Sequence, residues 1–185
     1  MLVNLRSFRQ KARIHQKAFK QYLGKIKKNP PRGLDTIAAG IDAEVWKEVD
    51  CLSCANCCKS MTPTFTRADI KRISTYLEMT HIEFKEKWLK FDKKDGDWVN
   101  KKQPCQFLDH TTNMCSIYEV RPLDCSGFPY LKKRKMSDYL HVHQQNVVYC
   151  PATFKMVEKM MERIVVVLTS CESRKERRVQ VVRLC

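Results

Sequence analysis

The 185-residue sequence shows no segment that would direct the chain into or across a membrane. Residues 1–20 are charged throughout and contain no apolar stretch followed by small residues, so we expect no secretory signal peptide. The longest apolar run, residues 164–168, is far shorter than the roughly 20 residues that a membrane-spanning helix requires. These absences predict a cytoplasmic protein.

Glycine is also scarce, with five residues in the chain, and no G-x-G-x-x-G sequence is present. This excludes the usual fingerprint of flavin- and dinucleotide-binding enzymes. We find neither a Ser/His/Asp arrangement nor a nucleophile elbow that would indicate a hydrolase. A catalytic function is therefore not favoured, although an electron carrier would need none of these motifs.

Cysteine, in contrast, is abundant, with ten residues in the chain. A protein in a reducing compartment cannot rely on disulfides for stability. Clustered thiols in such a protein more often bind metal or take part in redox chemistry. The cysteines are therefore the first candidates for a functional site.

The net charge of +15 is unevenly distributed along the chain. Residues 1–33 carry ten basic and no acidic side chains, and residues 155–185 carry eight basic and four acidic ones. The intervening residues 34–154 contribute only +1. The basic character thus belongs to the two ends, and the cysteine-rich middle is almost neutral.

The N-terminal segment 1–33 is predicted to form a basic amphipathic helix that ends at Asn29-Pro30-Pro31, because proline cannot continue a helix. Its apolar residues recur at three- and four-residue steps and should pack on the body of the protein. An alternative is that the helix contacts an anionic membrane surface or nucleic acid, which charge alone does not favour. The expected stripe comprises Leu2, Leu5, Phe8, Ala12, His15, Phe19, Tyr22 or Leu23, and Ile26.

Two capping patterns predict short helices in the middle of the chain. A hydroxyl followed three residues later by a carboxylate occurs at Thr66 and again at Thr80. These patterns predict helices over about 67–78, with Ile70, Ile73 and Leu77 inward, and about 81–91, with Phe84, Trp88 and Phe91 inward.

The sequence patterns that predict the other elements are less distinct. We predict a helix near 43–49 and a last one over about 152–168. A polar turn at 93–97 precedes a possible strand at 98–100, and residues 107–108 could pair with 116–118 as a hairpin.

The densest group of cysteines comprises Cys51, Cys54, Cys57 and Cys58, four thiols within eight residues. A Cys-x-x-Cys step lets a tight turn aim two sulfurs at one metal ion, and the step occurs twice in succession here. Buried structural cysteines usually occur singly on apolar faces, whereas these lie beside polar residues. We therefore predict that all four ligate metal.

Four further cysteines are spread along the chain, at Cys105, Cys115, Cys125 and Cys150. Their spacings are less diagnostic, but together with the first group they give eight candidate metal ligands. Eight thiols suffice for two four-thiolate sites, two iron–sulfur clusters or one polynuclear site. Cys171 and Cys185 lie in the basic tail and are not included.

The expected cofactor is zinc or iron, since soft thiolates suit both zinc and iron–sulfur clusters. The run Cys-x2-Cys-x2-Cys matches the first three ligands of a bacterial ferredoxin. Cys58 follows immediately, however, which breaks the ferredoxin spacing. Zinc tolerates more varied spacings of its ligands. The sequence therefore supports zinc and an iron–sulfur cluster almost equally as the cofactor.

Histidine could compete with cysteine as a ligand at three positions. His141 and His143 would lie on one side of a strand, but the apolar residues around them favour an edge strand without a ligand role. His110 lies between two cysteines and could replace one of them.

The combined motif resembles the YkgJ-like cysteine-cluster family, whose CxxCxxCC domain is described as zinc- or iron-chelating. The resemblance covers roughly residues 50–155 and implies metal chelation through the cysteines. Ala55-Asn56 stands where members often have glycine, so we expect Asn56 to adopt the left-handed turn conformation. Beyond the first four cysteines, the matching segments are Pro104–Asp109, Cys115–Pro122, Cys125 and Phe128-Pro129.

Arg121-Pro122, within this motif, has a physical interpretation of its own. Proline stiffens the approach to Cys125. The guanidinium could donate to thiolates or pair with Glu119 or Asp124, or it could simply be solvated.

Together these patterns predict an α+β protein, small and mostly helical, in which a loop-rich cysteine core is stabilised by metal. We expect three segments: the helix of 1–33, a metal-chelating domain over 34–155, and a C-terminal helix and basic tail over 156–185. The expected function is metal binding without catalysis, with an iron–sulfur redox protein as the alternative. A bound structural zinc would add on the order of 10 kcal/mol to folding.

Overall fold

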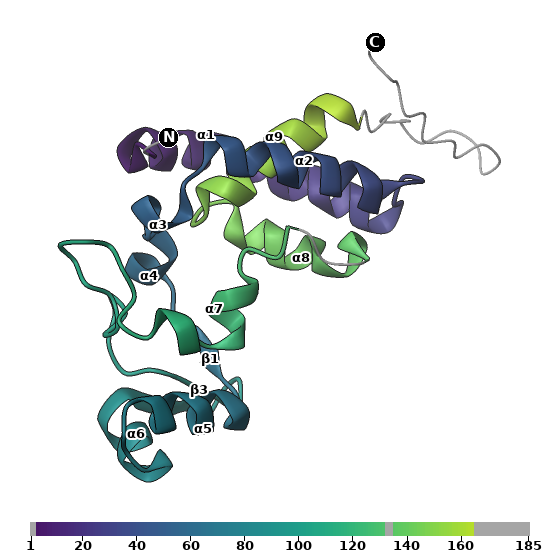
Figure 1. Cartoon of the computed structure of the whole chain (residues 1–185). Coiled ribbons are helices and arrows are strands. Elements are labelled where there is room, and N and C mark those ends of the chain that lie inside the picture. The colour runs from purple at the N-terminus through teal and green to yellow at the C-terminus, as the bar shows by residue number, and fades with distance from the viewer. Residues whose placement is uncertain (1–2, 132–134, 165–185) are drawn as a thin grey trace. The chain divides into compact units, whose positions relative to one another are not determined.

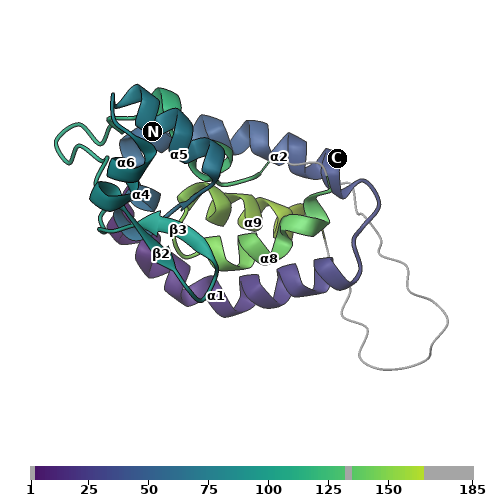
Figure 2. The same ribbon diagram turned by 90° about the horizontal axis from the view of Figure 1, so that it is seen from below.

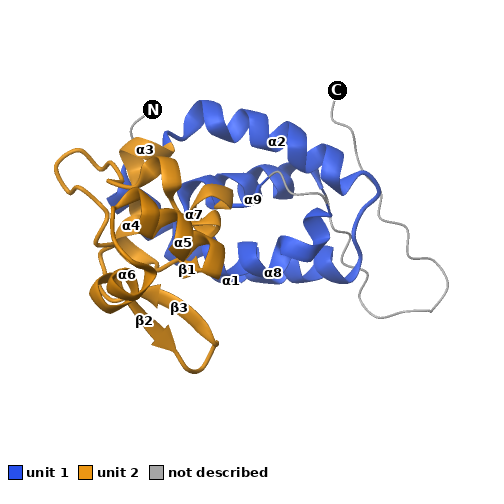
Figure 3. Cartoon of the chain, turned by 60° about the horizontal axis from the view of Figure 1, so that its bottom comes forward, with its two compact units in different colours: residues 1–50, 129–185 blue, residues 51–128 orange. Residues whose placement is uncertain are grey.

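The computed structural model describes residues 3–131 and 135–164 (Figure 1). Contacts along the backbone divide the chain into two compact units, which Figure 3 colours separately. Unit 1 consists of Met1–Asp50 and Pro129–Cys185, and unit 2 consists of Cys51–Phe128. Unit 2 is therefore an insertion between the two halves of unit 1.

Unit 1 is built from helices. Helix α1 packs against α8 and α9, and α2 packs against the same two helices (Figure 2). The N-terminal helices thus form their core with helices that follow more than a hundred residues later. The bounds are α1 Leu5–Lys28, α2 Leu34–Glu48, α8 Met136–Asn146 and α9 Pro151–Arg163.

Helix α1 confirms the predicted amphipathic helix. The side chain of Asn4 caps its first turn by accepting a hydrogen bond from the amide of Ser7. The helix ends at Lys28, directly before the Asn29-Pro30 sequence that was expected to stop it. Its buried residues are Phe8, Ala12, Phe19, Tyr22, Leu23 and Ile26. His15, expected on this stripe, is exposed, although its ring stacks on Phe19.

The core of unit 1 is aromatic at one end and aliphatic elsewhere. Phe154 of α9 packs between Phe8 and Phe19 of α1, with ring centroids 5.8 and 4.9 Å away. The hydroxyl of Tyr22 donates to the carbonyls of Met160 and Ile164, at 2.8 and 3.1 Å. Because a buried hydroxyl needs a partner, these bonds fix α1 against the end of α9.

Helix α8 overturns the predicted edge strand around His141 and His143. The residues that it buries are spaced by four, three and four positions, which is a helical and not a strand period. They are Met136, Leu140 and His143 of the helix and Val147, its C-cap, all at most 1% exposed. The Leu-His-Val-His alternation is therefore coincidental, and the two rings point in different directions: His143 is buried and His141 is exposed.

Helix α2 is longer than the predicted helix at 43–49. Its acidic side chains face the basic side chains of α9: Lys159 Nζ lies 2.8 Å from Glu48, and Arg163 Nη2 lies 2.6 Å from Glu44. Helix α9 confirms the last predicted helix as far as Arg163, and the predicted residues 165–168 lie outside the described residues.

Unit 2 combines short helices with a small antiparallel sheet, in the order β1-β3-β2. The capping boxes at Thr66 and Thr80 are confirmed. Each threonine hydroxyl accepts a hydrogen bond from the amide three residues later, and the carboxylate of that later residue accepts one from the threonine amide. The bounds are α3 Cys51–Cys54, α4 Asn56–Ser60, β1 Thr64–Phe65, α5 Arg67–Tyr76, α6 His81–Trp88, β2 Leu89–Asp92, β3 Asp97–Asn100, a 3₁₀ turn Tyr118–Val120 and α7 Leu123–Gly127.

The sheet corrects one helix boundary. The helix expected to reach residue 91 ends at Trp88, and the chain continues directly into β2, so Phe91 is half exposed and not inward. The predicted strand at 98–100 lies within β3, which pairs with β2 around the predicted polar turn. The hairpin at 107–118 is reduced to one bridge between Leu108 and Cys115 and two hydrogen bonds, from the amide of Ser116 to the carbonyl of Phe107 and from the amide of Asp109 to the carbonyl of Met114.

Unit 2 has its own small core, which lies between α5, α6 and the loop around Phe107. Cys105 and Cys115 are partly buried against this core, so two of the candidate ligands border apolar side chains. The predicted α+β, mostly helical class is confirmed. No helix in the described ranges has both the length and the apolar content to cross a bilayer. The core residues are Phe65, Ile70, Ile73, Phe84, Leu89, Phe107 and Ile117.

Candidate metal centre

Seven of the eight candidate cysteines belong to unit 2, where they come from four separate parts of the chain. Cys51 and Cys54 lie on α3, Cys57 and Cys58 on α4, Cys105 and Cys115 on the loops either side of Phe107, and Cys125 on α7. Cys150 belongs to unit 1, where it is the N-cap of α9 and is buried.

The two helices of the CxxCxxCC motif meet at Ala55. This residue, and not Asn56, adopts the left-handed conformation, with φ 45° and ψ 19°. Asn56 instead begins α4 and is buried, which leaves no freedom for it to form the turn. The left-handed residue reverses the chain between α3 and α4, so that Cys54 is buried while Cys51 stays exposed.

The adjacent thiols of Cys57 and Cys58 lie 3.9 Å apart. The hydrogen bond with Cys57 lowers the pKa of Cys58 to about 7, although burial opposes the shift; the backbone amide of Cys58 and the charge of Lys59 also favour the thiolate. A thiol with such a pKa is substantially ionised at neutral pH, and the thiolate is the form that binds metal.

Cys105 is tied directly to the CxxCxxCC segment. Its amide donates to the carbonyl of Cys58 at 2.8 Å. The side-chain amide of Asn100 donates to Cys105 Sγ at 3.2 Å, and Gln106 holds the Asn100 oxygen at 2.8 Å. A donor fixed in this way orients a sulfur and stabilises its thiolate, as residues around metal ligands commonly do.

The charge of Cys58 acts on the thiols of Cys105, Cys115 and Cys125. Burial raises the pKa of Cys105, Cys115 and Cys125, and the negative charge of Cys58 raises all three further. The shift of Cys125 also contains contributions from Cys105 and Cys115. Four thiols from three distant segments therefore share one electrostatic neighbourhood.

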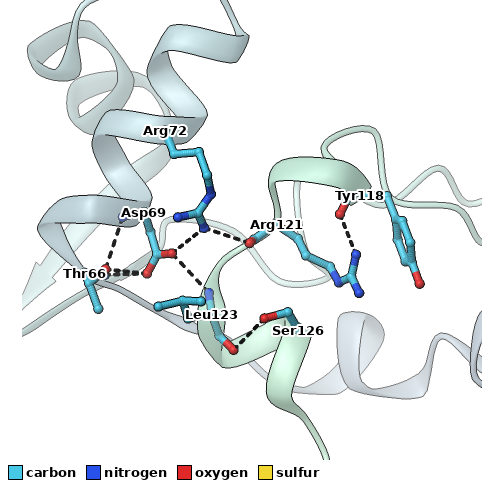
Figure 4. Close-up of polar contacts among 7 residues, drawn as sticks. All are labelled: Thr66, Asp69, Arg72, Tyr118, Arg121, Leu123 and Ser126. Atoms are coloured by element: carbon cyan, nitrogen blue, oxygen red, sulfur yellow. Dashed lines mark hydrogen bonds and ion pairs between the residues drawn. The ribbon is translucent and has the colours of Figure 1, made fainter.

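Helix α7, which carries Cys125, is held in place by a carboxylate of α5 (Figure 4). The buried side chain of Asp69 accepts from Thr66, from Arg72 at 2.5 Å and from the amide of Leu123 at 3.1 Å. Burial alone would raise the pKa of Asp69, but these bonds lower it. The sequence indicated Asp69 only as a helix cap.

A second carboxylate, on α7 itself, also holds this helix in place. Asp124 accepts hydrogen bonds from the amide and the hydroxyl of Thr64, at 3.0 and 3.2 Å, which joins α7 to β1. Sequence reasoning missed the anchoring roles of Asp69, Asp124 and Asn100. Only the position of Asp124 next to a cysteine could have suggested one of them.

Arg121 follows the 3₁₀ turn and lies over the ring of Tyr118, 3.8 Å from its centroid (Figure 4). Its guanidinium donates to the carbonyl of Tyr118 at 2.7 Å. Its charge acts against the rise in the pKa of Cys115. Among the described residues, this guanidinium therefore donates to the carbonyl of its own turn and forms neither the predicted hydrogen bond to a thiolate nor the predicted pair with Glu119 or Asp124.

The candidate histidines are in different environments from these cysteines. His143 is buried in unit 1, and neither ring nitrogen has a hydrogen-bond partner in the described structure. Burial and the charge of His141 lower the pKa of His143 to about 4. His110 is exposed in the turn between Cys105 and Cys115, and its ligand role stays a prediction.

Within the described residues, no three Cys, His, Asp or Glu side chains stand close enough to form a finished metal site. The donor set nevertheless fits zinc or iron, because four partly buried soft thiols share one neighbourhood. A bound cation would neutralise the charges of the four thiolates and release the protons of the thiols.

Comparisons with known proteins agree with the donor set. Residues 50–151 match the CxxCxxCC family, described as a "putative zinc- or iron-chelating domain". An uncharacterized protein of Methanocaldococcus jannaschii is 33% identical over 108 residues, which cover 58% of this chain and 55% of that protein. The match thus spans about half the length of this relative. No solved structure matches the chain. Because more than half of its residues match the family model, the chain belongs to the CxxCxxCC family.

Proposed function

We propose that unit 2 binds zinc or iron through a four-thiolate centre of Cys58, Cys105, Cys115 and Cys125. The observation that carries the proposal is the 2.8 Å hydrogen bond from the Cys105 amide to the Cys58 carbonyl, which holds two cysteine segments together. The charge of Cys58 also raises the pKa of Cys105, Cys115 and Cys125, so these thiols lie near it. Four sulfurs are the complement of a tetrahedral structural zinc or a single iron. The chelating description of the family supports the same chemistry.

The surrounding residues have distinct roles in this proposal. Asn100 orients the sulfur of Cys105 by a hydrogen bond, and the 2.8 Å bond between the Cys105 amide and the Cys58 carbonyl keeps two ligand segments in register. Asp69 and Asp124 position the helix of Cys125. Arg121 provides positive charge toward Cys115. A bound metal would supply charge neutralisation and a cross-link between these segments.

Cys51, Cys54 and Cys57 extend this centre in the proposal. Cys57 Sγ is 3.9 Å from Cys58 Sγ, so a small movement would exchange one thiol for the other or admit both. Cys51 and Cys54 are the further ligands if more than one metal ion binds. Cys150 stays a predicted ligand, and its place in unit 1 makes it the weakest member of the set.

The second candidate function is an iron–sulfur electron carrier. The observation that favours it is the excess of thiols: unit 2 holds seven cysteines, three more than one mononuclear site uses. A cluster bound by four of them would leave others near it as alternative ligands. The cytoplasmic location expected from the sequence is part of both proposals, since thiols stay reduced there.

Metal analysis of protein purified without oxygen tests the proposal and separates the two candidates. Zinc in a colourless sample indicates the structural site, and iron with acid-labile sulfide in a brown sample indicates a cluster. We expect about one metal ion or one cluster per chain, with Cys105→Ser reducing the content at least about tenfold, as loss of a ligand should.

Cys171→Ser is the matched control, because Cys171 is a cysteine of the same chain outside the proposed set. It should leave the metal content unchanged. A metal content that is equal in both variants and in the original protein would overturn the assignment of Cys105. Correctly folded, fully reduced protein without zinc or iron would overturn the function.

A further inference from the structure

Helix α1 carries a stripe of positive charge that the proposed metal centre does not use. With 3.6 residues per turn, seven basic residues fall within an arc of about 100° on the side away from its buried face. No acidic residue occurs anywhere in residues 1–33. All seven side chains are exposed. The basic stripe consists of Arg6, Arg9, Arg13, Lys17, Lys20, Lys27 and Lys28.

Several acidic residues of unit 1 are engaged away from the basic stripe. Glu44 and Glu48 of α2 are engaged by Lys155, Lys159 and Arg163 of α9. In α8, which packs against α1, the acidic residues are limited to Asp138. Neither Lys17 nor Lys20 forms an ion pair with an acidic side chain in the part of the chain that the structure describes.

Unit 1 as a whole concentrates the charge of the protein. Its sequence holds 23 basic and 10 acidic residues, for a net charge of +13, whereas unit 2 holds 12 basic and 10 acidic residues. A surface with this bias attracts polyanions over distances of about one Debye length, roughly 8–10 Å at physiological salt.

The apolar face of α1 is already used inside unit 1. Phe8, Phe19 and Leu23 are at most 7% exposed and pack in the bundle. An interfacial membrane helix must insert its apolar face among lipids, which this arrangement prevents. On the outward side of α1 the large apolar residues exposed are limited to Ile14. The stripe is therefore suited to a charged partner that it need not penetrate.

We propose that the basic stripe of α1 binds the phosphate backbone of a double-stranded nucleic acid without reading its sequence. The helix has 24 residues and is thus about 36 Å long, close to the 34–36 Å of one duplex turn. Lysine and arginine side chains on such a rod can then meet phosphates wherever the rod crosses the backbone of either strand. No aromatic side chain lies on the stripe to stack on unpaired bases, which favours a duplex over a single strand.

Fluorescence anisotropy with labelled 16-base-pair RNA and DNA duplexes of one sequence tests the proposal. We expect binding in which log K falls with log salt at a slope of about −4 to −5, as about five phosphate contacts would give. Lys17→Glu/Lys20→Glu should weaken binding at least about tenfold and make the slope shallower by about two. The two duplexes show whether RNA or DNA is preferred.

Lys11→Glu/Lys25→Glu is the matched control. It changes the same residue types on the same helix and alters the net charge equally, but both positions lie about 100° or more from the centre of the stripe. Binding by the control within about threefold of the original protein is expected. If both variants weaken binding equally, the attraction belongs to the net charge alone and the proposal fails.

Vesicles of phosphatidylserine and phosphatidylcholine test whether the basic stripe binds an anionic membrane instead of a nucleic acid. Binding to vesicles that depends on Lys17 and Lys20, without duplex binding, would overturn the proposal in favour of a membrane. Metal content and circular dichroism of each variant should match the original protein, because α1 carries no cysteine. The inference and the metal-binding function can therefore fail independently.

Discussion

The two units of this protein bury different kinds of side chain and carry different charge. Unit 1 packs long helices around a continuous apolar core that includes Phe8, Phe19 and Phe154. Unit 2 has short helices, a small sheet and a core of a few apolar residues bordered by cysteines. Most of the buried apolar side chains belong to the first unit, whereas the second has a smaller apolar core with partly buried cysteines packed against it.

The comparison teaches where a metal ion would matter. Short helices such as α3, α4 and α7 have too few residues to be stable by themselves, so their positions depend on tertiary bonds. Asp69 and Asp124 provide some of these bonds for α7. A metal cross-link between Cys58, Cys105, Cys115 and Cys125 would supply the remainder.

Metal removal should produce the largest difference between the units. After chelation under reducing conditions, we expect amides of α4 and α7 to lose hydrogen-exchange protection while those of α1 and α9 keep theirs. A four-thiolate zinc site contributes on the order of 10 kcal/mol to the folding of small domains. Equal loss of protection in both units would show that they do not differ in this way.

The next largest effect should come from Phe154→Ala, which removes the ring between Phe8 and Phe19. We expect the free energy of unfolding of unit 1 to fall by about 3–5 kcal/mol, measured by urea denaturation followed by circular dichroism. Phe91→Ala is the control, because Phe91 is 49% exposed and its loss should cost less than about 1 kcal/mol. Similar losses for the two variants would contradict the packing described here.

Acid should weaken unit 1 through His143, whose pKa is lowered from 6.5 to about 4 by burial and by His141. Between these values the unfolded chain binds a proton that the folded chain does not, so stability falls as pH falls from about 6.5 to 4. The full loss is about 3 kcal/mol. Thermal unfolding across this range should show it, and His143→Leu should flatten the pH dependence; an unchanged profile would contradict it.

The smallest of the four effects is expected for Asp69→Asn in unit 2. The change keeps the shape of the side chain but removes the charge that Arg72, Thr66 and the Leu123 amide contact. We expect a loss of about 1.5–3 kcal/mol, because hydrogen bonds to a charged group have this value. Asp95→Asn, in an exposed turn, should change stability by less than about 0.5 kcal/mol. If unit 1 rather than unit 2 is destabilised, the anchoring role is wrong.

Local signals in the sequence predicted the elements that local chemistry determines. The capping boxes at Thr66 and Thr80 and the stop at Asn29-Pro30 use atoms within a few residues of one another, and each was confirmed. Most of the buried stripe of α1 was also predicted, because one face of a long helix leaves a regular pattern. The exceptions are His15, which is exposed, and Leu5, which is half-buried, while Leu2 lies outside the described residues.

Elements that depend on distant partners were predicted less well. The strand expected around His141 is helix α8, because the side chains that α8 buries meet α1 and α2, which a local alternation cannot reveal. The chain around Phe91 forms strand β2, and not the predicted end of a helix, because it pairs with β3. In the site, the cysteines could be chosen from spacing, but the anchoring by Asp69 and Asp124 depends on contacts about 54 to 60 residues apart.

The insertion of unit 2 between the halves of unit 1 has a consequence for synthesis on the ribosome. Helix α1 leaves the ribosome first, but the helices α8 and α9 that cover its apolar face follow only after residue 129. Unit 2 is synthesised before α8 and α9, so it can fold and bind metal while the apolar face of α1 is still uncovered. Until the last helix emerges, Phe8, Phe19 and Leu23 are exposed to water, and chaperones have their best opportunity to bind the nascent chain.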